Sequence, residues 1–330
     1  MKTRKLISII LVSVMLFGIF SIAPVSARSA DNPLNLAFRQ QSAVDRAKVL
    51  IEKVCKGDIS KFPDAFRALF EAILSVLIDV PLTPLGDKLD LSGYELVFED
   101  DFDGESIDLD SWYIRGEGKS RGGYKSGDQI KVKDGNLIMS GQYDENGKFG
   151  AGWYGGDLAL IEKYKEGYFE CRCICNTGTG FWSAFWIQAR HPYEAEYSQG
   201  GVGGAELDIF ESIYENRRNS FIFQTIHCAG VDGVQEGFQS RILGFYKGKN
   251  INKEYNTYGL KWTDEEYIFY VNGVETTRST FGNGVSTVEE EVILSICIPD
   301  AEILDKLDKD KYYTEYIVDY VRIYQESENG

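Results

Sequence analysis

The segment GGAELDIFES, residues 203–212, interleaves three acidic side chains with large apolar ones. This pattern is typical of a β-strand that has one buried face. In a regular strand Glu206 and Asp208 would point to one face and Glu211 to the other, because side chains alternate. One β-bulge at residues 209–210 would restore the alternation. We therefore predict a bulged strand that turns all three carboxylates toward one groove.

The chain around this segment consists of short runs rich in Tyr, Phe, Ile and Val, interrupted by Gly, Asn and Asp. Such runs, without a long helical period, indicate an all-β domain. Asn272-Gly273 between two apolar runs predicts a tight hairpin turn, and residues 134–136 predict another. We therefore predict a two-sheet antiparallel β-sandwich, a jelly roll with a concave cleft, over residues 89–326, followed by a tail at 327–330.

The N-terminal part of the chain has a different texture. Residues 1–27 combine basic residues, an apolar run and a small-x-small processing site, which is the pattern of a signal peptide. We therefore expect a secreted, extracellular protein without a membrane anchor after cleavage. Residues 28–88 repeat apolar side chains at helical spacing and predict a short helical segment. Three roles are compatible with this segment: packing on the main domain, a pro-segment, or an arm that binds a partner.

The overall charge restricts the partners. The chain carries a formal net charge of −16 at pH 7. Nucleic acid and anionic lipid are unfavourable partners for such a surface, because both are negatively charged.

The six cysteines are too few to staple a chain of this length, so apolar burial must supply the core. Cys171, Cys173 and Cys175 alternate along a predicted strand, and we expect them to be small core residues. A disulfide from this strand to Cys228 or Cys297 on another strand remains an alternative. No Cys/His cluster has the spacing of a zinc site.

Three carboxylates crowded on one strand repel one another, which indicates a functional rather than a stabilising role. Two carboxyl groups about 5–5.5 Å apart suit a retaining glycosidase. We predict Glu206 as nucleophile, Glu211 as acid/base, and Asp208 as the group that orients Glu206 and tunes its proton affinity. A solvated acidic strand and a calcium site are alternatives. The interleaved apolar residues disfavour the first, and the preference of calcium for loop ligands disfavours the second.

The motif Glu206-x-Asp208-x-x-Glu211 resembles the signature of glycoside hydrolase family 16 in its bulge-containing form. Further similar segments are residues 94–102, 109–112, 134–137, 167–172, 181–186, 258–262 and 318–324. The resemblance covers roughly residues 89–325 and implies a jelly roll of two curved sheets, substrate in the concave face, and retention of anomeric configuration. The segment before it has no counterpart in this resemblance.

The resemblance also narrows the substrate. The longer acid motif is similar to that of β-1,3-glucanases and of galactan-cleaving members, whereas mixed-linkage glucanases carry a form one residue shorter. We expect endo-cleavage of a laminarin-type β-1,3-glucan. A β-1,3-1,4-glucanase, an agarase- or carrageenase-like galactan hydrolase, a transglycosylase and a non-catalytic carbohydrate-binding jelly roll are the alternatives. Arg115, Lys119, Arg121 and Lys125 lie in a Gly-rich segment near the expected cleft and keep a sulfated substrate open, since sulfate needs basic partners.

Candidates for substrate binding are aromatic and polar, because sugars present apolar ring faces and hydroxyls. Trp182 and Trp186 are four apart on a predicted strand and share a face, and Trp182 resembles a cleft tryptophan of the family. His227 resembles a cleft histidine, and we expect it to contact substrate or a catalytic carboxylate. Trp153 and Arg115 complete the candidate set.

The predicted chemistry requires no cofactor. Family members often carry a structural calcium ion, and the resemblance places Asp319 as its carboxylate ligand and Gly135 as a carbonyl donor. Asp319 alternates with apolar neighbours in the last strand, so a partner other than a metal would also satisfy it. We expect a monomer that binds a polysaccharide.

Overall fold

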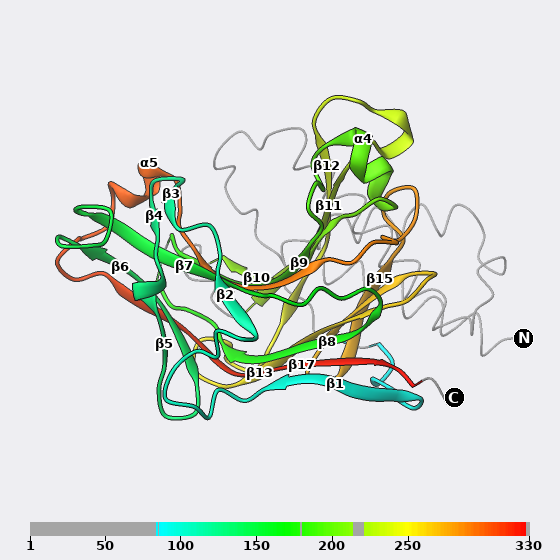
Figure 1. Ribbon diagram of the computed structural model, residues 1–330, viewed down its shortest axis with the longest axis horizontal. Coiled ribbons are helices and arrows are strands. Elements are labelled where there is room, and N and C mark those ends of the chain that lie inside the picture. Colours follow the sequence, from blue (N-terminus) through cyan, green and yellow to red (C-terminus); the bar gives the residue numbers. More distant parts are fainter. Residues whose placement is uncertain (1–83, 85, 179, 214–220, 328–330) are drawn as a thin grey trace, which may run out of the picture. The chain divides into compact units, whose positions relative to one another are not determined.

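The computed structural model describes residues 84, 86–178, 180–213 and 221–327. Their strands form two facing layers, as Figure 1 shows. The predicted signal peptide and nearly all of the predicted helical segment lie outside the described residues. None of the described helices is both long and apolar enough to cross a membrane.

The first sheet carries the acidic segment near its centre. Its strands, in spatial order, are β2 (Trp112–Ile114), β7 (Gly152–Leu160), β16 (Glu291–Cys297), β9 (Trp182–Gln188), β10 (Glu206–Ile213), β11 (Phe221–Ala229) and β12 (Phe238–Lys247). The strand that holds the acids, β10, therefore has β9 on one side and β11 on the other.

The second sheet packs behind the first. Its strands are β15 (Val274–Ser279), β14 (Tyr267–Val271), β13 (Asn256–Trp262), β8 (Gly167–Ile174), β17 (Tyr313–Glu326), then β1 (Tyr94–Asp100) and β6 (Leu137–Asp144) along the far edge of β17, and β5 (Ile130–Val132) beside β6. Because β6 also pairs with β7, the two sheets join at one edge. The predicted antiparallel sandwich is confirmed.

The core lies between the sheets. Phe210 on β10 packs against Tyr258 of β13 and Tyr316 of β17, with ring centroids 4.2 and 6.1 Å apart. All three side chains are fully buried. These contacts hold the back of β10 and leave its other face to the cleft.

The cysteines in β8 and directly after it are core residues, as predicted. Cys171, Cys173 and Cys175 are buried, and neither they nor Cys228 and Cys297 form a disulfide within the described part of the chain. The bridge that the sequence left open is therefore not made there.

Two predicted turns are also confirmed. Asn272 and Gly273 have φ values of 51° and 68° between β14 and β15, and Asp134 and Gly135 have 53° and 69° between β5 and β6. Left-handed backbone at both central positions matches the twist of a hairpin.

Residues 86–89 run beside β15. The Gly86 N–H donates to the Glu275 carbonyl and the Leu89 N–H to the Gly273 carbonyl, both at 2.9 Å. Lys88 also forms a bridge with Val274, so Gly86 and Lys88, at the end of the segment that was predicted to be helical, lie along β15 instead.

Loops and short elements rise at both ends of the first sheet. They are the hairpin of β3 (Gly118–Ser120) and β4 (Gly123–Lys125), the helices α4 (Ala195–Ser198) and α5 (Ala301–Leu304), and the 3-10 turns η2 (Gly127–Gln129), η3 (Gln199–Gly201) and η4 (Val231–Gly233). Figure 1 shows β3, β4 and α5 at one end and α4 with β12 at the other, on the same side of β9 and β10.

Candidate active site

The predicted bulge lies in β10. On the β9 side the pairing skips from Asp208 to Phe210, so Ile209 has no partner of its own. On the β11 side the register shifts in the same interval. Because of this extra residue, Glu206, Asp208 and Glu211 line one cleft. The prediction that one groove receives all three acids is confirmed.

Glu206 is the carboxylate with the most hydrogen-bond donors. Its Oε2 accepts from the Gln188 amide and from the Tyr193 hydroxyl. Its Oε1 lies 3.9 Å from Nε2 of His227, whereas Oδ2 of Asp208 lies 3.1 Å from the same nitrogen. His227 therefore pairs mainly with Asp208, and Oε1 is the less engaged oxygen of Glu206.

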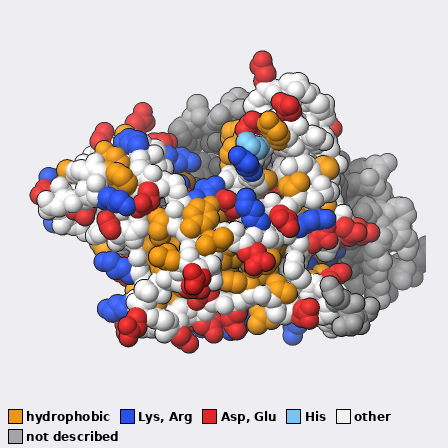
Figure 2. All heavy atoms as spheres, in the orientation of Figure 1, with side chains coloured by type: hydrophobic (Ala, Val, Ile, Leu, Met, Phe, Trp, Pro, Cys, Tyr) orange, Lys and Arg blue, Asp and Glu red, His pale blue; other side chains and the backbone are white. Residues whose placement is uncertain are grey.

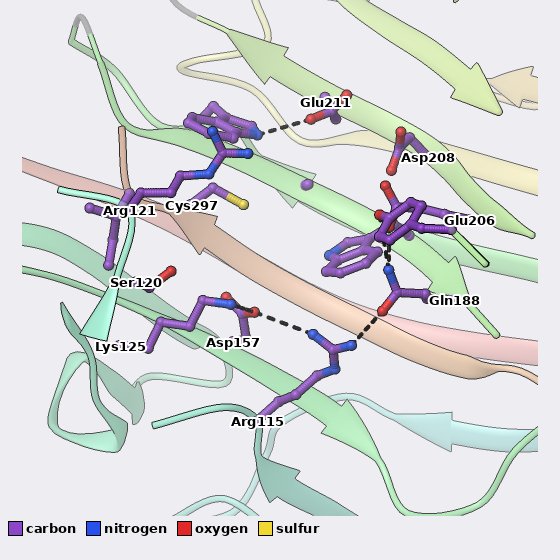
Figure 3. A pocket seen from close by; sticks show the side chains of 15 residues that line it. Arg115, Ser120, Arg121, Lys125, Asp157, Gln188, Glu206, Asp208, Glu211 and Cys297 are labelled. Atoms are coloured by element: carbon purple, nitrogen blue, oxygen red, sulfur yellow. Dashed lines mark hydrogen bonds and ion pairs between the residues drawn. The ribbon is translucent and has the colours of Figure 1, made fainter. Parts of the chain in front are cut away.

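Glu211 sits among fewer donors. Its Oε1 accepts a 3.0 Å hydrogen bond from the Trp182 indole N–H. The guanidinium of Arg121 lies over the Trp182 ring, 5.1 Å from its centroid. Figure 3 shows Glu211 at one end of the row of acids, with Arg121 nearby.

The surroundings give these acids different proton affinities. Burial, followed by repulsion from Asp208, raises the pKa of Glu206 to about 7. The charge of His227 and the hydrogen bonds from Tyr193 and Gln188 lower this pKa and so limit the rise. Burial and then Asp208 raise the pKa of Glu211 well above its ordinary value, with His227 and the Trp182 N–H opposing the rise. Glu211 is therefore suited to hold a proton, as an acid must.

His227 is a cation within the acidic cluster. Burial by itself lowers its pKa, but the hydrogen bond to Asp208 and the charges of the three carboxylates raise the pKa to about 9. A protonated His227 donates to Asp208 and offsets part of the repulsion between the acids.

This pairing also bears on the alternative of a metal at the acids. Ligand atoms of Glu206, Asp208 and His227 lie within 4.8 Å of one another. Calcium, however, takes oxygen ligands. A protonated His227 supplies a positive charge here, so the cluster fits an internal ion pair better than a calcium ion.

Strand register aligns the groups around Glu206 in one row across five strands. Glu291 of β16 is opposite Gln188 of β9, Gln188 is opposite Glu206, Glu206 is opposite His227 of β11, and His227 is opposite Ser240 of β12. Nδ1 of His227 lies 2.5 Å from the Ser240 hydroxyl. Ser240 thereby orients the imidazole from the side remote from Asp208. We call these five residues the cross-strand row.

A group of cations borders the same cleft. Nη2 of Arg115 donates to Gln188 Oε1 at 2.5 Å, and its guanidinium lies 5.1 Å from the centroid of the Trp186 ring. Asp157 is buried and pairs with Lys125 and, at 3.8 Å, with Arg115. Figure 3 shows Arg115 and Gln188 lying between Asp157 and Glu206. Figure 2 shows Lys and Arg side chains along the hollow of this face.

Most of the predicted binding residues meet at this cleft. Trp182, Trp186 and Arg115 line it, and His227 adjoins it through Asp208. Lys125 and Arg121, noted in the sequence as part of a basic cluster, line it as well.

Trp153 does not lie there, and its prediction as a substrate contact needs correction. Its side chain is 8% exposed and packs edge-on against Tyr143 and Tyr312, with centroids 5.4 and 5.6 Å apart. The ring belongs to the core beneath the start of β7, where no sugar can stack on it.

The predicted calcium ligands lie together, but with cationic partners. Asp319 and Gly135 line one surface pocket with Arg172 and Arg322. Asp319 pairs directly with Arg172, and Arg322 lies 3.4 Å from Asp101. Asp101 and Asp103 line the same pocket, so carboxylates and guanidinium groups share it, and the calcium site stays a prediction.

Several residues of the site were not predicted from the sequence. Gln188 continues the alternation of Trp182 and Trp186 on β9, so its position on the strand was a usable signal. Tyr193 and Asp157 gave no such signal, because a loop and a distant strand bring them to the acids.

A family model described as "Beta-porphyranase A-D, GH16 domain" matches residues 96–326. "Glucan endo-1,3-beta-glucosidase A1" of Niallia circulans is 24% identical over 204 residues, which cover 56% of this chain and 29% of that protein. "Beta-porphyranase E" of Zobellia galactanivorans is 27% identical over 200 residues, or 53% of this chain and 65% of that one. The chain thus spans less than two thirds of the length of either relative.

Solved structures resemble the fold. One is "SCLam, a non-specific endo-beta-1,3(4)-glucanase from family GH16", which matches with a TM-score of 0.58 and 21% identity over 75% of this chain and 97% of that one. At 21% identity, this similarity supports the fold of the chain and nothing finer.

Proposed function

Because the chain belongs to glycoside hydrolase family 16, we propose that it is an endo-acting, retaining hydrolase of β-linked polysaccharide. The observation that carries the proposal is the pair Glu206 and Glu211, which face one cleft and meet different hydrogen-bond donors. A double displacement needs one carboxylate as nucleophile and one carboxylic acid as proton donor. The relative from N. circulans is named an endo-acting enzyme, and we propose the same mode of cleavage.

In the first step Glu211 gives its proton to the glycosidic oxygen while Glu206 attacks the anomeric carbon. The bond from that carbon to the leaving sugar breaks, and an ester to Glu206 forms. Oε1 is the attacking oxygen in this proposal, since Oε2 already accepts from Gln188 and Tyr193. Asp208 pairs with His227, and its repulsion raises the pKa of Glu206, which favours the protonated form of the nucleophile.

In the second step the Glu211 carboxylate takes a proton from water, and the resulting hydroxide oxygen attacks the anomeric carbon. The ester breaks, Glu206 leaves as a carboxylate and Glu211 is protonated again. Two inversions give net retention of configuration. Carboxyl groups and water suffice for both steps, so the mechanism calls for no cofactor.

As substrate we propose a sulfated β-galactan of the kind that porphyranases are named for. Arg121 favours it: the side chain is 54% exposed, lies over Trp182 beside Glu211, and pairs in the described part of the chain with the exposed Asp300 at 3.8 Å. A guanidinium held over a cleft tryptophan can bind a sulfate while the ring stacks on the sugar. The matching family model and β-porphyranase E support the same class.

The laminarin-type β-1,3-glucan expected from the sequence is the second candidate. It is favoured by the bulged acid motif and by the relative from N. circulans, whose name specifies a 1,3-β-glucan. A neutral glucan, however, would leave Arg121 without an anionic partner on the substrate.

Reducing-end release from porphyran, agarose, carrageenan, laminarin and lichenan tests these assignments. We expect oligosaccharides from porphyran, with the β-anomer detected first by proton NMR, and less from its desulfated form. Cleavage of laminarin alone would select the second candidate. Binding without release from any of the glycans would refute hydrolysis and favour a binding module.

We also propose that the chain acts outside the cell, because a polysaccharide of this size does not reach the cytoplasm. The signal-peptide pattern at residues 1–27 supports this. Comparing the N-terminus of protein recovered from culture medium with that of the full chain would test it.

A further inference from the structure

The β9–β10 connection brings a tyrosine to the proposed nucleophile. The Tyr193 hydroxyl donates to Oε2 of Glu206. The Gln188 amide donates to the same Oε2 and, at 3.1 Å, to the Tyr193 oxygen. The three groups form a closed triangle. Since the phenol oxygen accepts from Gln188, its own proton is directed to Glu206.

We propose that Tyr193 is a positioning residue that keeps Glu206 ionised and turns Oε1 toward the anomeric carbon. The inference rests on the proposed role of Glu206 as nucleophile. A hydrogen bond donated to a carboxylate favours its charged form. With Oε2 fixed by two donors, the carboxyl plane cannot rotate freely, and the other oxygen remains for the attack.

The connection is anchored, so the phenol is held in place. Buried Ser198 accepts from the Ala229 N–H of β11 at 3.1 Å and donates to the Gly204 carbonyl at 2.9 Å. The Tyr193 ring packs against Phe238 at the start of β12, with centroids 5.1 Å apart. The aromatic contact depends on the ring alone, whereas the contact with Glu206 depends on the hydroxyl. The two can therefore be separated by substitution.

Several charged groups face Glu206 and must be counted in any pH argument. Asp208 and Glu211 come from β10, and the charge of Asp208 favours protonation of Glu206. His227 of β11 has the opposite effect. The buried Glu290, which accepts from the Ala205 N–H, lies behind the start of β10.

Further out, Arg115 reaches Glu206 through Gln188, and Glu291 of β16 pairs with Arg115 at 3.2 Å. Tyr193→Phe leaves all these groups in place and removes one donor. The pKa of Glu206 should therefore rise.

The test compares Tyr193→Phe with Tyr197→Phe. Tyr197 belongs to the same connection but is 48% exposed and stacks on His191. The Glu206 titration is followed by carbon NMR of glutamate labelled at the carboxyl carbon, and its signal is assigned by its loss in Glu206→Gln. In Tyr193→Phe we expect the midpoint and the acidic limb of kcat/KM to move up by about 1 pH unit, with kcat recovering at higher pH. Tyr197→Phe should match the wild type.

An unchanged Glu206 midpoint in Tyr193→Phe would overturn the proposal. So would a fall in kcat that is equal at every pH, because that is the mark of a structural role. The NMR titration needs no substrate, so it separates this inference from the proposed function. A shifted midpoint in a protein that cleaves no glycan would instead overturn the hydrolase assignment, and the role of Tyr193 with it.

Discussion

At the scale of single residues, Glu206 and Glu211 differ in their donors and should differ in their response to substitution. Glu211→Ala removes the acid, so cleavage of polysaccharide should fall by about 10²–10⁴-fold. An aryl glycoside with a good leaving group needs little protonation and should lose much less in its first step. Glu206→Gln is the matched control, because loss of the nucleophile should abolish turnover of both substrates while the melting temperature stays close to that of the wild type. Equal losses for both substrates in Glu211→Ala would contradict its acid role.

His227 carries a prediction about stability. Its pKa rises from 6.5 to about 9 in the folded protein, so the folded state keeps a proton that the unfolded chain releases between these values. The resulting stabilisation is fully present below pH 6.5 and is lost as the pH rises through about 9. Urea denaturation of wild type and His227→Gln should therefore give a difference in free energy of unfolding that shrinks across this window. A difference that does not change with pH would refute the ion pair.

At the scale of elements, the β3–β4 hairpin holds Arg121 in a backbone conformation that non-glycine residues rarely adopt. Arg121 has a φ of 45° in the turn between Ser120 and Gly123. This region costs an ordinary residue about 1 kcal/mol. The hairpin thus keeps an arginine over the cleft where an asparagine or glycine would be more stable.

Arg121→Asn should therefore separate stability from recognition. Asn tolerates left-handed backbone, so the free energy of unfolding should stay equal or rise by up to about 1 kcal/mol. Loss of a charge-assisted hydrogen bond to sulfate should lower kcat/KM on porphyran by about 10–100-fold. Activity on any neutral glycan should be unaffected. The control is Lys119→Gln, since the Lys119 ammonium lies over Tyr124, away from the acids. An equal loss on sulfated and desulfated substrate would contradict sulfate recognition.

The bulge shows what a short sequence can predict about an element. The alternation of acids and apolar residues is local, and a single misplaced side chain, Glu211, was enough to locate the extra residue. Trp153 shows the limit. Its burial depends on Tyr312, far along the chain, and a turn-proximal tryptophan looks the same in sequence whether it faces a cleft or a core.

At the scale of the whole molecule, net charge and local charge act in opposite directions on an anionic substrate. The chain carries −16 at pH 7, so long-range repulsion should slow encounter with a sulfated polysaccharide at low salt. We expect kcat/KM on porphyran to rise as salt approaches about 0.1 M, where the repulsion is screened, and to fall at higher salt as the contact with Arg121 weakens. Laminarin should show a flat profile under the same conditions. A monotonic fall for porphyran from the lowest salt would contradict the argument.

The sequence could therefore predict the sandwich, its turns and the three acids, because each depends on local alternation or turn chemistry. It could not predict Tyr193, Asp157 or Ser240 as neighbours of those acids. The path of the β9–β10 loop places Tyr193, and strand pairing and register place Asp157 and Ser240. Neither can be read from a local pattern of residues.

The cross-strand row has a further consequence for how the protein acquires activity as it folds. Four of its five strands, β9 to β12, follow one another in the chain, whereas β16 pairs beside β9 only after a long loop has closed. Closure of long loops is slow, and a slip of one residue in any strand would turn its member of the row to the opposite face. Hydrolysis should be among the last properties to return on refolding, well after the chain has become compact. The time at which activity returns would therefore report when all five strands have paired in register.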